Sequence, residues 1–384
     1  MTTYSHTSVS NRSRTTVRLP LASNEHINEF TGATVLKYSG LILNGIVDSY
    51  ANEPGRTYVT NRPSISITHD ASNDTPNTNG RGIYYWGSST LATPLTYLVN
   101  YDNVYLTDYT TACTVYGSGT AFTAGTEKVY FQEWYSGNED YLFIINPEGN
   151  QVFVIAASSP TVMINMDDSI ADTGNGAPFH ASDSWDVTGL PVNNGKTLCH
   201  GAVSLDQYLF LGCKDGTIWN SNVDNWLNWS ALDFITAERD NDQLLFIEKT
   251  KDHLAAFGER STELMYDAAN STGSPLSVST VIAYRICIVS GQCAWADGDD
   301  IHFLGIKPAG DFSVYVLRNF DLQERINPTL NSYLKHGRTE ANLYTVASGL
   351  STGGHTYYIL TIFDGQNVPQ RSIVYDTYTQ FWYE

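Results

Sequence analysis

The stretch "DQYLFLGCKDGTIWNS", Asp206–Ser221, contains two runs of strand-forming residues on either side of Lys214-Asp215-Gly216. Aromatic, β-branched and other large apolar side chains fill both runs, and such residues favour a half-buried pleated strand. The Asp-Gly pair tolerates the positive backbone angles of a tight hairpin turn. The stretch therefore predicts a β-hairpin.

Similar hairpins recur along the chain. Their expected turns are Tyr101-Asp102-Asn103, Pro147–Asn150, Pro308–Asp311 and Asp364-Gly365. The apolar spacing of Thr250–Ala269 fits a helix about as well as two strands around Phe257-Gly258-Glu259. Turn centres lie roughly 40 to 67 residues apart, about the length of a four-stranded propeller blade with additions. We predict an all-β protein, a β-propeller of five or six irregular blades. The competing architecture, a pair of β-sandwiches, would show tighter strand spacing.

The beginning of the chain differs from the rest. Residues 1–75 are polar and irregular, which predicts an N-terminal arm and docking segment, and residues 76–384 form the predicted propeller domain. Ser72–Gly82 is rich in Asn, Thr, Asp and Gly, as expected at such a boundary. The N-terminus lacks the apolar core of a secretion signal. The longest apolar run, Val281–Val289, is interrupted by Arg285, so no membrane anchor is expected.

The charge of the chain restricts its partners. The formal net charge is −19, from 21 basic and 40 acidic side chains. A protein that grips duplex DNA needs a basic face to neutralise phosphates, so ordinary nucleic-acid binding is excluded. An acidic surface either keeps the protein soluble or lets DNA slide past without sticking. The five cysteines form no CxxC pair, so neither a zinc site nor a disulfide framework is indicated, and no cofactor is predicted.

Asp233 and Glu238, in "WSALDFITAERDNDQL" (Trp229–Leu244), have the residue types of a catalytic acid and base. Glycoside hydrolysis needs two carboxyl groups about 5 to 9 Å apart. In an extended chain these two would lie about 16 Å apart on opposite faces. We therefore interpret them as loop carboxylates that cap backbone N–H groups or meet a neighbouring subunit.

Three other motifs have the residue types of functional sites without the required context. "NMDDS" contains Asp167 and Asp168, and "ADGDDIH" contains Asp297, Asp299 and Asp300, but neither has the ligand spacing of a calcium loop. We interpret these carboxylates as part of a turn before a strand, or as residues that line a channel. "CKDGTIW" departs from the Asp-box of sialidase-like propellers, and a hairpin turn explains it. "GLSTG" places Ser351 in a G-x-S-x-G pattern, but a predicted strand follows where a nucleophile elbow needs a helix. No catalytic residue is predicted.

Five segments, in this order, resemble passages of the packaged-DNA stabilization proteins of short-tailed bacteriophages, also called tail hub or nozzle proteins. Leu43–Ile67 is similar to the family's opening passage, and "ALDFITAERDNDQL" is similar to its blade connector, ALDF-x-x-AE-x-x-x-D-x-L. "LAAFGERSTE" is similar to L-x-x-FG-x-x-(S/T)-x-E, and "GDDIHFLG" with "LQERINPTLNSYL" to a GD-x-x-x-FLG … RI passage. "GHTYY" and "YDTYTQFW" are similar to GH-x-x-Y … YD-x-x-x-x-x-W.

The resemblance implies a non-enzymatic structural protein of the virion tail, assembled in the host bacterial cytoplasm. Such subunits form a homohexameric ring below the portal and adaptor, extend the DNA channel, help to retain packaged DNA and offer attachment sites for tail fibres or a needle. The implied partners are other copies of the chain, the portal-adaptor proteins, the fibre or needle proteins and DNA in transit. In that setting, channel-lining or intersubunit roles are predicted for Asp167, Asp168, Asp233, Glu238, Asp297, Asp299 and Asp300. The alternatives are a carbohydrate-binding or glycan-cleaving propeller and a general protein-interaction propeller.

One further expectation concerns closure of the ring of blades. A propeller closes best when its last blade takes strands from both ends of the chain, because an unpaired sheet edge invites aggregation. Residues before Ser72 are therefore candidates for a strand of the last blade.

Overall fold

A computed structural model describes most of the chain. The described residues are 2–5, 16–19, 45–49, 57–61, 80–88, 91, 93–106, 111–115, 121–135, 139–166, 186–237, 242–327, 330–335, 344–352, 354–365 and 369–383. Strands dominate this part, and its helical segments are short: η3 (Pro191–Asn194), η4 (Gly291–Cys293) and one turn at 330–335. The predicted all-β class is confirmed.

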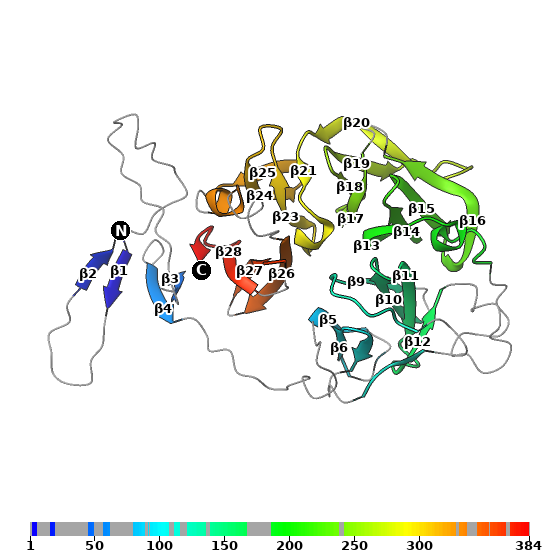
Figure 1. Ribbon diagram of the computed structural model, residues 1–384, viewed down its shortest axis with the longest axis horizontal. Helices are drawn as coiled ribbons and strands as arrows, with labels where there is room; N and C mark the ends of the chain where they lie inside the picture. Colours follow the sequence, from blue (N-terminus) through cyan, green and yellow to red (C-terminus); the bar gives the residue numbers. More distant parts are fainter. Residues whose placement is uncertain are drawn as a thin grey trace. The chain divides into compact units, whose positions relative to one another are not determined.

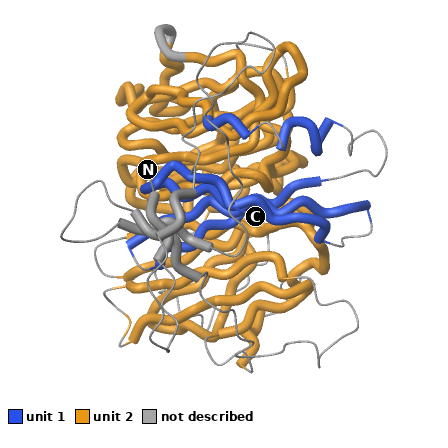
Figure 2. The backbone as a smooth tube through the Cα atoms, turned by 90° about the vertical axis from the view of Figure 1, so that its left-hand side faces the viewer, with its two compact units in different colours: residues 1–67, 325–384 blue, residues 68–324 orange. Residues whose placement is uncertain are grey.

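Contacts divide the chain into two compact units (Figure 2). One comprises residues 1–67 and 325–384, and the other comprises residues 68–324. The predicted boundary between 1–75 and 76–384 stays a prediction.

The unit of residues 68–324 contains four propeller blades, each a four-stranded antiparallel meander. In Figure 1 they follow one another from teal to orange. The first blade consists of β9 (Tyr130–Tyr135), β10 (Asp140–Asn146), β11 (Gln151–Ala156) and β12 (Val162–Asn165), with β8 (Thr114–Val115) parallel to β12. The second consists of β13 (Leu198–Leu205), β14 (Tyr208–Cys213), β15 (Thr217–Asn222) and β16 (Asn225–Thr236).

The third blade consists of β17 (Leu244–Thr250), β18 (His253–Gly258), β19 (Thr262–Asp267) and β20 (Leu276–Tyr284). In the fourth, the first strand is interrupted: β21 (Cys287–Ile288) and β22 (Ala294–Asp297) both pair with β23 (Asp300–Ile306), and β24 (Phe312–Arg318) and β25 (Asp321–Arg325) follow. A three-stranded sheet of β5 (Gly80–Trp86), β6 (Leu95–Asn100) and β7 (Asn103–Tyr105) precedes the blades.

The first strands of the second and third blades, β13 and β17, run parallel and join where His200 pairs with Phe246. Gly201 makes this close approach feasible. Its φ is +86°, and a Cβ there would lie 2.2 Å from the Ile247 carbonyl oxygen. Parallel first strands of successive blades are the arrangement that a propeller requires around its axis, so the predicted propeller class is confirmed. This unit contains four blades, and the predicted number of five or six stays a prediction.

The unit of residues 1–67 and 325–384 contains a further meander of the same form. It consists of β26 (Tyr344–Thr352), β27 (His355–Phe363), β28 (Pro369–Asp376) and β29 (Trp382–Tyr383). Two hairpins, β1 (Thr2–Ser5) with β2 (Thr16–Leu19) and β3 (Gly45–Ser49) with β4 (Thr57–Asn61), complete the described strands. All four described strands of the meander come from residues 344–383, so within the described residues it takes none from before Ser72.

The predicted hairpins are present. The turn at Lys214-Asp215-Gly216 joins β14 to β15, and Gly216 has a φ of +89°. The other four predicted turns join β6 to β7, β10 to β11, β23 to β24 and β27 to β28. Thr250–Ala269 contains β18 and β19, so the strand alternative is the correct one there.

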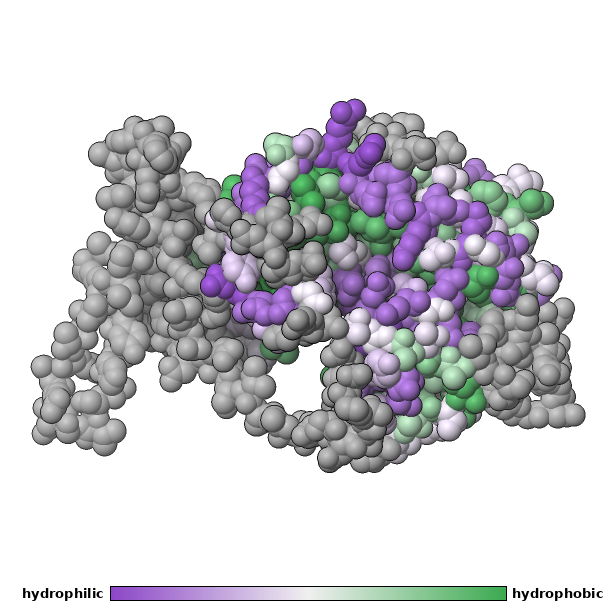
Figure 3. All heavy atoms as spheres, in the orientation of Figure 1, coloured by the Kyte–Doolittle hydropathy of each residue, from purple (hydrophilic) through white to green (hydrophobic). Residues whose placement is uncertain are grey.

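Apolar side chains from the sheets form the core of the second unit. One cluster lies on β5–β12 and includes Trp86, Tyr97 and Phe153; another lies on β13–β20 and includes Phe210, Ile247 and Met265. Hydrophilic side chains cover much of the described surface in the view of Figure 3, with smaller hydrophobic groups between them. Among the described residues, no helix has the length and apolar character needed to cross a membrane.

Candidate functional site

The predicted acidic residues do not form one cluster. Asp233 lies on β16, the outermost strand of the second blade, and Asp297, Asp299 and Asp300 lie at the turn from β22 to β23. Asp167, Asp168 and Glu238 lie outside the described residues. Partial burial raises the pKa of Asp233, and burial together with the neighbouring Asp300 raises the pKa of Asp297. Within the described part of the chain, no group of three or more His, Cys, Asp or Glu side chains could hold a metal ion.

Asp299 at the β22–β23 turn joins the third blade to the fourth, and Asp300 forms an ion pair within the fourth blade. Asp299 Oδ1 accepts a hydrogen bond from the Lys251 backbone N–H (3.1 Å), and its carbonyl oxygen accepts one from Thr250 Oγ1 (2.8 Å). Asp300 Oδ2 pairs with Arg318 Nη2 at 2.5 Å and Nε at 2.7 Å. These contacts give both residues a structural role within one subunit. Their predicted channel-lining or intersubunit role stays a prediction.

One end of the blades carries unbalanced negative charge. The turns β13–β14, β15–β16 and β17–β18 lie at this end because β13 and β17 are parallel, and the β22–β23 turn joins them through Asp299. They expose four carboxylates, Asp206, Asp224, Asp252 and Asp299, and one cation, Lys251 of the β17–β18 turn. At the opposite end the charges alternate, with Lys196 bonded to Asp215 at 2.6 Å and Arg260 at the β18–β19 turn. The acidic end is thus a distinct surface of the second unit.

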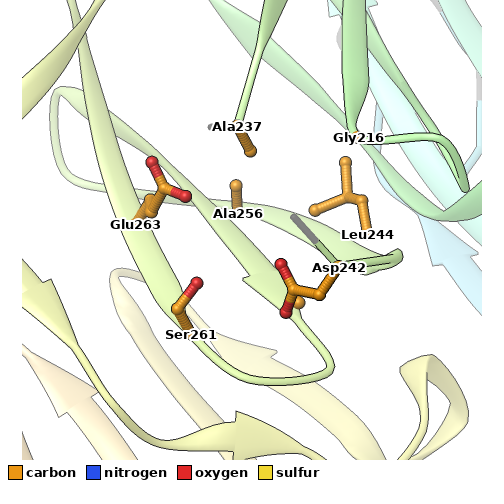
Figure 4. Close-up of a pocket in the computed structure, with 8 residues that line it drawn as sticks. Gly216, Ala237, Asp242, Leu244, Ala256, Ser261 and Glu263 are labelled. Carbon is orange, nitrogen blue, oxygen red and sulfur yellow. The ribbon is translucent and has the colours of Figure 1, made fainter. Parts of the chain in front are cut away.

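The connector between the second and third blades encloses a small cavity, shown in Figure 4. Its volume is about 10 Å³, close to the space of a single water molecule. Ala237, Asp242 and Leu244 of the connector line it together with Gly258, Ser261 and Glu263 of the β18–β19 hairpin. Asp242 Oδ2 accepts the Arg260 backbone N–H at 2.5 Å, and a Cβ at position 258 would lie 2.6 Å from the same oxygen. The two motifs therefore meet to form a structural joint between blades.

The GH…YD motif builds a second structural joint, at the β26–β29 meander. His355 Nδ1 lies 2.7 Å from Asp376 Oδ2, and both side chains are buried. Asp376 Oδ1 also accepts the backbone N–H groups of Tyr378 (2.9 Å) and Thr379 (3.2 Å). The carboxylate therefore fixes the turn into β29.

Ser351 is not part of a catalytic triad with this pair. It pairs with Thr356 across the β26–β27 hairpin, whereas His355 pairs with Thr352. Adjacent strand residues point to opposite faces of a sheet, so Ser351 faces away from His355. The G-x-S-x-G pattern is followed by β27, as the interpretation of a hairpin turn requires.

Sequence reasoning missed Arg81, a buried arginine that joins the β5–β7 sheet to the first blade. Its side chain donates to the carbonyl oxygens of Glu127 (2.8 Å), Tyr101 and Thr123 (3.0 Å each), and to Asn146 Oδ1 (2.6 Å). Burial lowers the pKa of Arg81, and Glu148 at 3.7 Å opposes that shift. In the sequence Arg81 stands between two glycines, in "GRG", and this was the available sign of close packing around it. The structure bears this out at Gly82, where a Cβ would lie 2.9 Å from Val129.

A second set of polar residues that the sequence did not reveal lies where the first strands of the blades meet. Lys128, just before β9, donates from Nζ to the Ala294 carbonyl oxygen on β22 (2.8 Å), and Tyr130 Oη donates to that of Gly291 (2.5 Å). Burial lowers the pKa of Lys128 to about 8. Burial also raises the pKa of Glu248, on β17, to about 7. These contacts tie the first blade to the fourth across the axis of the unit.

The geometry is therefore that of a propeller whose motifs hold blades together. Residues 153–381 match the model of the phage stabilisation family, described as the bacteriophage P22 Gp10 β-propeller. The chain belongs to this family. Members of the phage stabilisation family are structural virion proteins, so this chain is a phage structural protein of packaged-DNA stabilisation and a component of the virion.

Other comparisons add only distant similarities to the family match. No curated protein matches the chain. The extracellular domain of a hybrid two-component system from B. thetaiotaomicron is 11% identical over 80% of this chain and 34% of that one, with a TM-score of 0.42. PorZ of Porphyromonas gingivalis is 13% identical over 83% and 35% of the two chains (TM-score 0.35), and BamB from Moraxella catarrhalis is 10% identical over 76% and 82% (TM-score 0.34). The chain spans about a third of the length of the first of these.

Proposed function

We propose that the chain is the subunit of a homohexameric tail nozzle, or hub, that continues the DNA channel below the portal and adaptor. Membership of the phage stabilisation family over residues 153–381 is the observation that carries the proposal. In such a ring the protein retains packaged DNA before infection and conducts it during ejection. Its other surfaces attach tail fibres or a needle.

The acidic end of the blades supports a place beside moving DNA. Carboxylates repel phosphates and release no counterions on contact, so a surface that exposes Asp206, Asp224 and Asp252 does not bind DNA tightly as it passes. The net charge of −19 is consistent with this role. We propose that the acidic end faces the channel of the ring. The partners in this proposal are further copies of the chain, the portal-adaptor proteins and the fibre or needle proteins.

Native mass measurement and cryo-electron microscopy test the assembly. The chain is mixed with the purified portal-adaptor complex, and the expected product is a six-fold ring on the distal side of the adaptor. A chain that stays monomeric at micromolar concentration in the presence of that complex contradicts the proposal.

Charge reversal tests the surface separately from the assembly. The triple variant Asp206→Lys, Asp224→Lys and Asp252→Lys should form the ring, because the three exposed residues lie in surface turns. It should bind duplex DNA with a salt-dependent affinity and slow DNA release from reconstituted particles. Unchanged DNA release, with ring formation intact, would show that this surface faces away from the channel.

The enzymatic alternative has a test of its own. Asp233 lies on the outer strand β16, and its predicted partner Glu238 lies outside the described residues. Asp233→Ala combined with Glu238→Ala should abolish any glycan turnover that these carboxylates catalyse. If the wild-type chain cleaves no glycan, that alternative is wrong.

A further inference from the structure

An open hollow of about 370 Å³ lies beside the second and third blades. Its walls come from β14, β15 and β16 and from the loop that joins β19 to β20. The volume lies within the range of about 300 to 1,000 Å³ that is usual for small-molecule sites. The polar side chains that line it include Tyr208, Asn220, Asn222, Asn225, Asp233 and Asn270.

The chemistry of these walls selects against anionic ligands. Among the described residues that line the hollow, none is Lys, Arg or His, and phosphate or nucleic acid would need such cations. The walls instead combine asparagine amides, hydroxyl groups and one carboxylate. Amides and hydroxyls both donate and accept hydrogen bonds, and a carboxylate accepts only. A neutral ligand with many hydroxyl groups matches this set.

Asn220 supplies an independent indication of a ligand. Its side chain is only 2% exposed, and its Nδ2 donates to the Ser221 carbonyl oxygen at 3.0 Å. Its Oδ1 has no hydrogen-bond partner among the described residues. A buried acceptor without a donor is costly to the fold. This oxygen is itself buried, so a ligand hydroxyl supplies the missing donor only when the Asn220 side chain turns toward the hollow.

The edge of the hollow supplies apolar contact. β16 bulges here, because its register with β15 moves from Ser221–Trp229 to Trp219–Phe234. The bulged segment carries Asp233 on the wall of the hollow. Val223, which also lines the hollow, is 54% exposed. Apolar side chains beside hydrogen-bonding groups are the combination that a sugar ring requires, because its faces present C–H groups and its edges present hydroxyls.

We propose that this hollow binds a neutral oligosaccharide. Asp233 accepts hydrogen bonds from ligand hydroxyls, Asn220 Oδ1 accepts another once its side chain turns toward the hollow, and Val223 contacts the C–H face of a ring. The site only binds, and no bond in the sugar is broken. It goes beyond the channel function. All its residues come from one subunit, and two of them, Val223 and Asn225, flank Asp224 of the acidic end.

The test uses the full chain and an immobilised panel of neutral and acidic oligosaccharides, followed by titration calorimetry with the neutral members that bind. Asp233→Asn should weaken binding at least tenfold, and Ser271→Trp, which places an indole in the hollow from an exposed loop position, should abolish it. Asp206→Asn is the matched control, since it makes the same change on an exposed turn outside the hollow and should bind as the wild type does. Melting curves of all three variants verify the fold.

Three results would overturn the proposal. The first is that no neutral oligosaccharide binds at millimolar concentration. The second is binding that Asp233→Asn, and a folded Ser271→Trp, leave unchanged. The third is a ligand of another class in the same hollow, either an acidic glycan or a peptide, that binds more tightly than every neutral sugar. Ring formation with the portal-adaptor complex is measured separately, so failure of the sugar site leaves the channel function untouched.

Discussion

Replacing Arg81 with alanine should destabilise the unit of residues 68–324 more than any exposed substitution. The side chain is among the largest fully buried ones in the described residues, and it donates four hydrogen bonds. Three of the acceptors are backbone carbonyls of residues 20 to 46 positions away, and the fourth is the side chain of Asn146. Alanine would leave these acceptors without their donor.

The expected loss is smaller than the sum of the four bonds. A hydrogen bond from a charged donor contributes about 1.5–3 kcal/mol, but such values do not add within one network. The lowered pKa of Arg81 shows that burial of its charge is unfavourable, and alanine removes this cost as well. Deleting one member of a buried charged network costs about 3–5 kcal/mol. At roughly 2–4 °C per kcal/mol for a unit of this size, the melting temperature should fall by about 6–20 °C.

The assay is urea unfolding followed by tryptophan fluorescence, with thermal unfolding in parallel. Trp86 lies on β5 together with Arg81 and is one of the eight tryptophans that contribute to the emission. Arg81→Lys keeps one positive charge but loses the planar fork of donors, so it should fall between alanine and the wild type. Arg260→Ala, at an exposed position, is the control and should change stability by less than about 0.5 kcal/mol. A loss below about 1 kcal/mol for Arg81→Ala would refute the reasoning.

Three further predictions concern the blade axis and the C-terminal meander. The raised pKa of Glu248, about 7, means that the folded state holds its proton up to a higher pH than the unfolded state does, so stability falls as the pH rises from about 4.5 to 7. Glu248→Gln should match the wild type at pH 5 and exceed it by up to about 3 kcal/mol at pH 8, as measured by urea unfolding; equal pH profiles would contradict this. Gly201→Ala should lower the melting temperature strongly, because its Cβ would meet the Ile247 carbonyl oxygen at 2.2 Å, and an unchanged melting curve would show that the approach is looser. Asp376→Ala should destabilise the meander by about 1–3 kcal/mol, because buried His355 and the backbone N–H groups of Tyr378 and Thr379 lose their hydrogen-bond partner; proteolysis of residues 344–383 measures the loss, and wild-type resistance would exclude the role.

The hairpins were predictable because their signals are local. The turn at Lys214-Asp215-Gly216 lies between two strand-forming runs, and the structure places a positive φ at Gly216 as the turn requires. The segment Thr250–Ala269 was ambiguous, because its apolar spacing fitted both a helix and two strands. Pairing of β18 with both β17 and β19 decides it, and two of those strands bury nearly all of their side chains.

The motifs that form the two structural joints could be recognised in the sequence, but the contacts between them could not. The motif around Asp242 and the motif around Gly258 could both be read, but a sequence does not show that they line one cavity of about 10 Å³. Likewise, "GH" and "YD" lie 21 residues apart, and only the pairing of β27 with β28 brings His355 to Asp376. Both motifs hold strands together.

The amino-acid sequence by itself determined the all-β class, the positions of the hairpin turns, the acidic character of the chain and its family. These properties depend on composition, on neighbouring residues and on short motifs in a fixed order. The tertiary structure decided where the charges are used: Arg81 buried among distant carbonyls, Lys128 and Glu248 at the blade axis, and Asp233 on the wall of a hollow at the outer strand. The physical reason is that burial and long-range pairing depend on which strands become neighbours. That arrangement is a property of the whole fold and of no single segment.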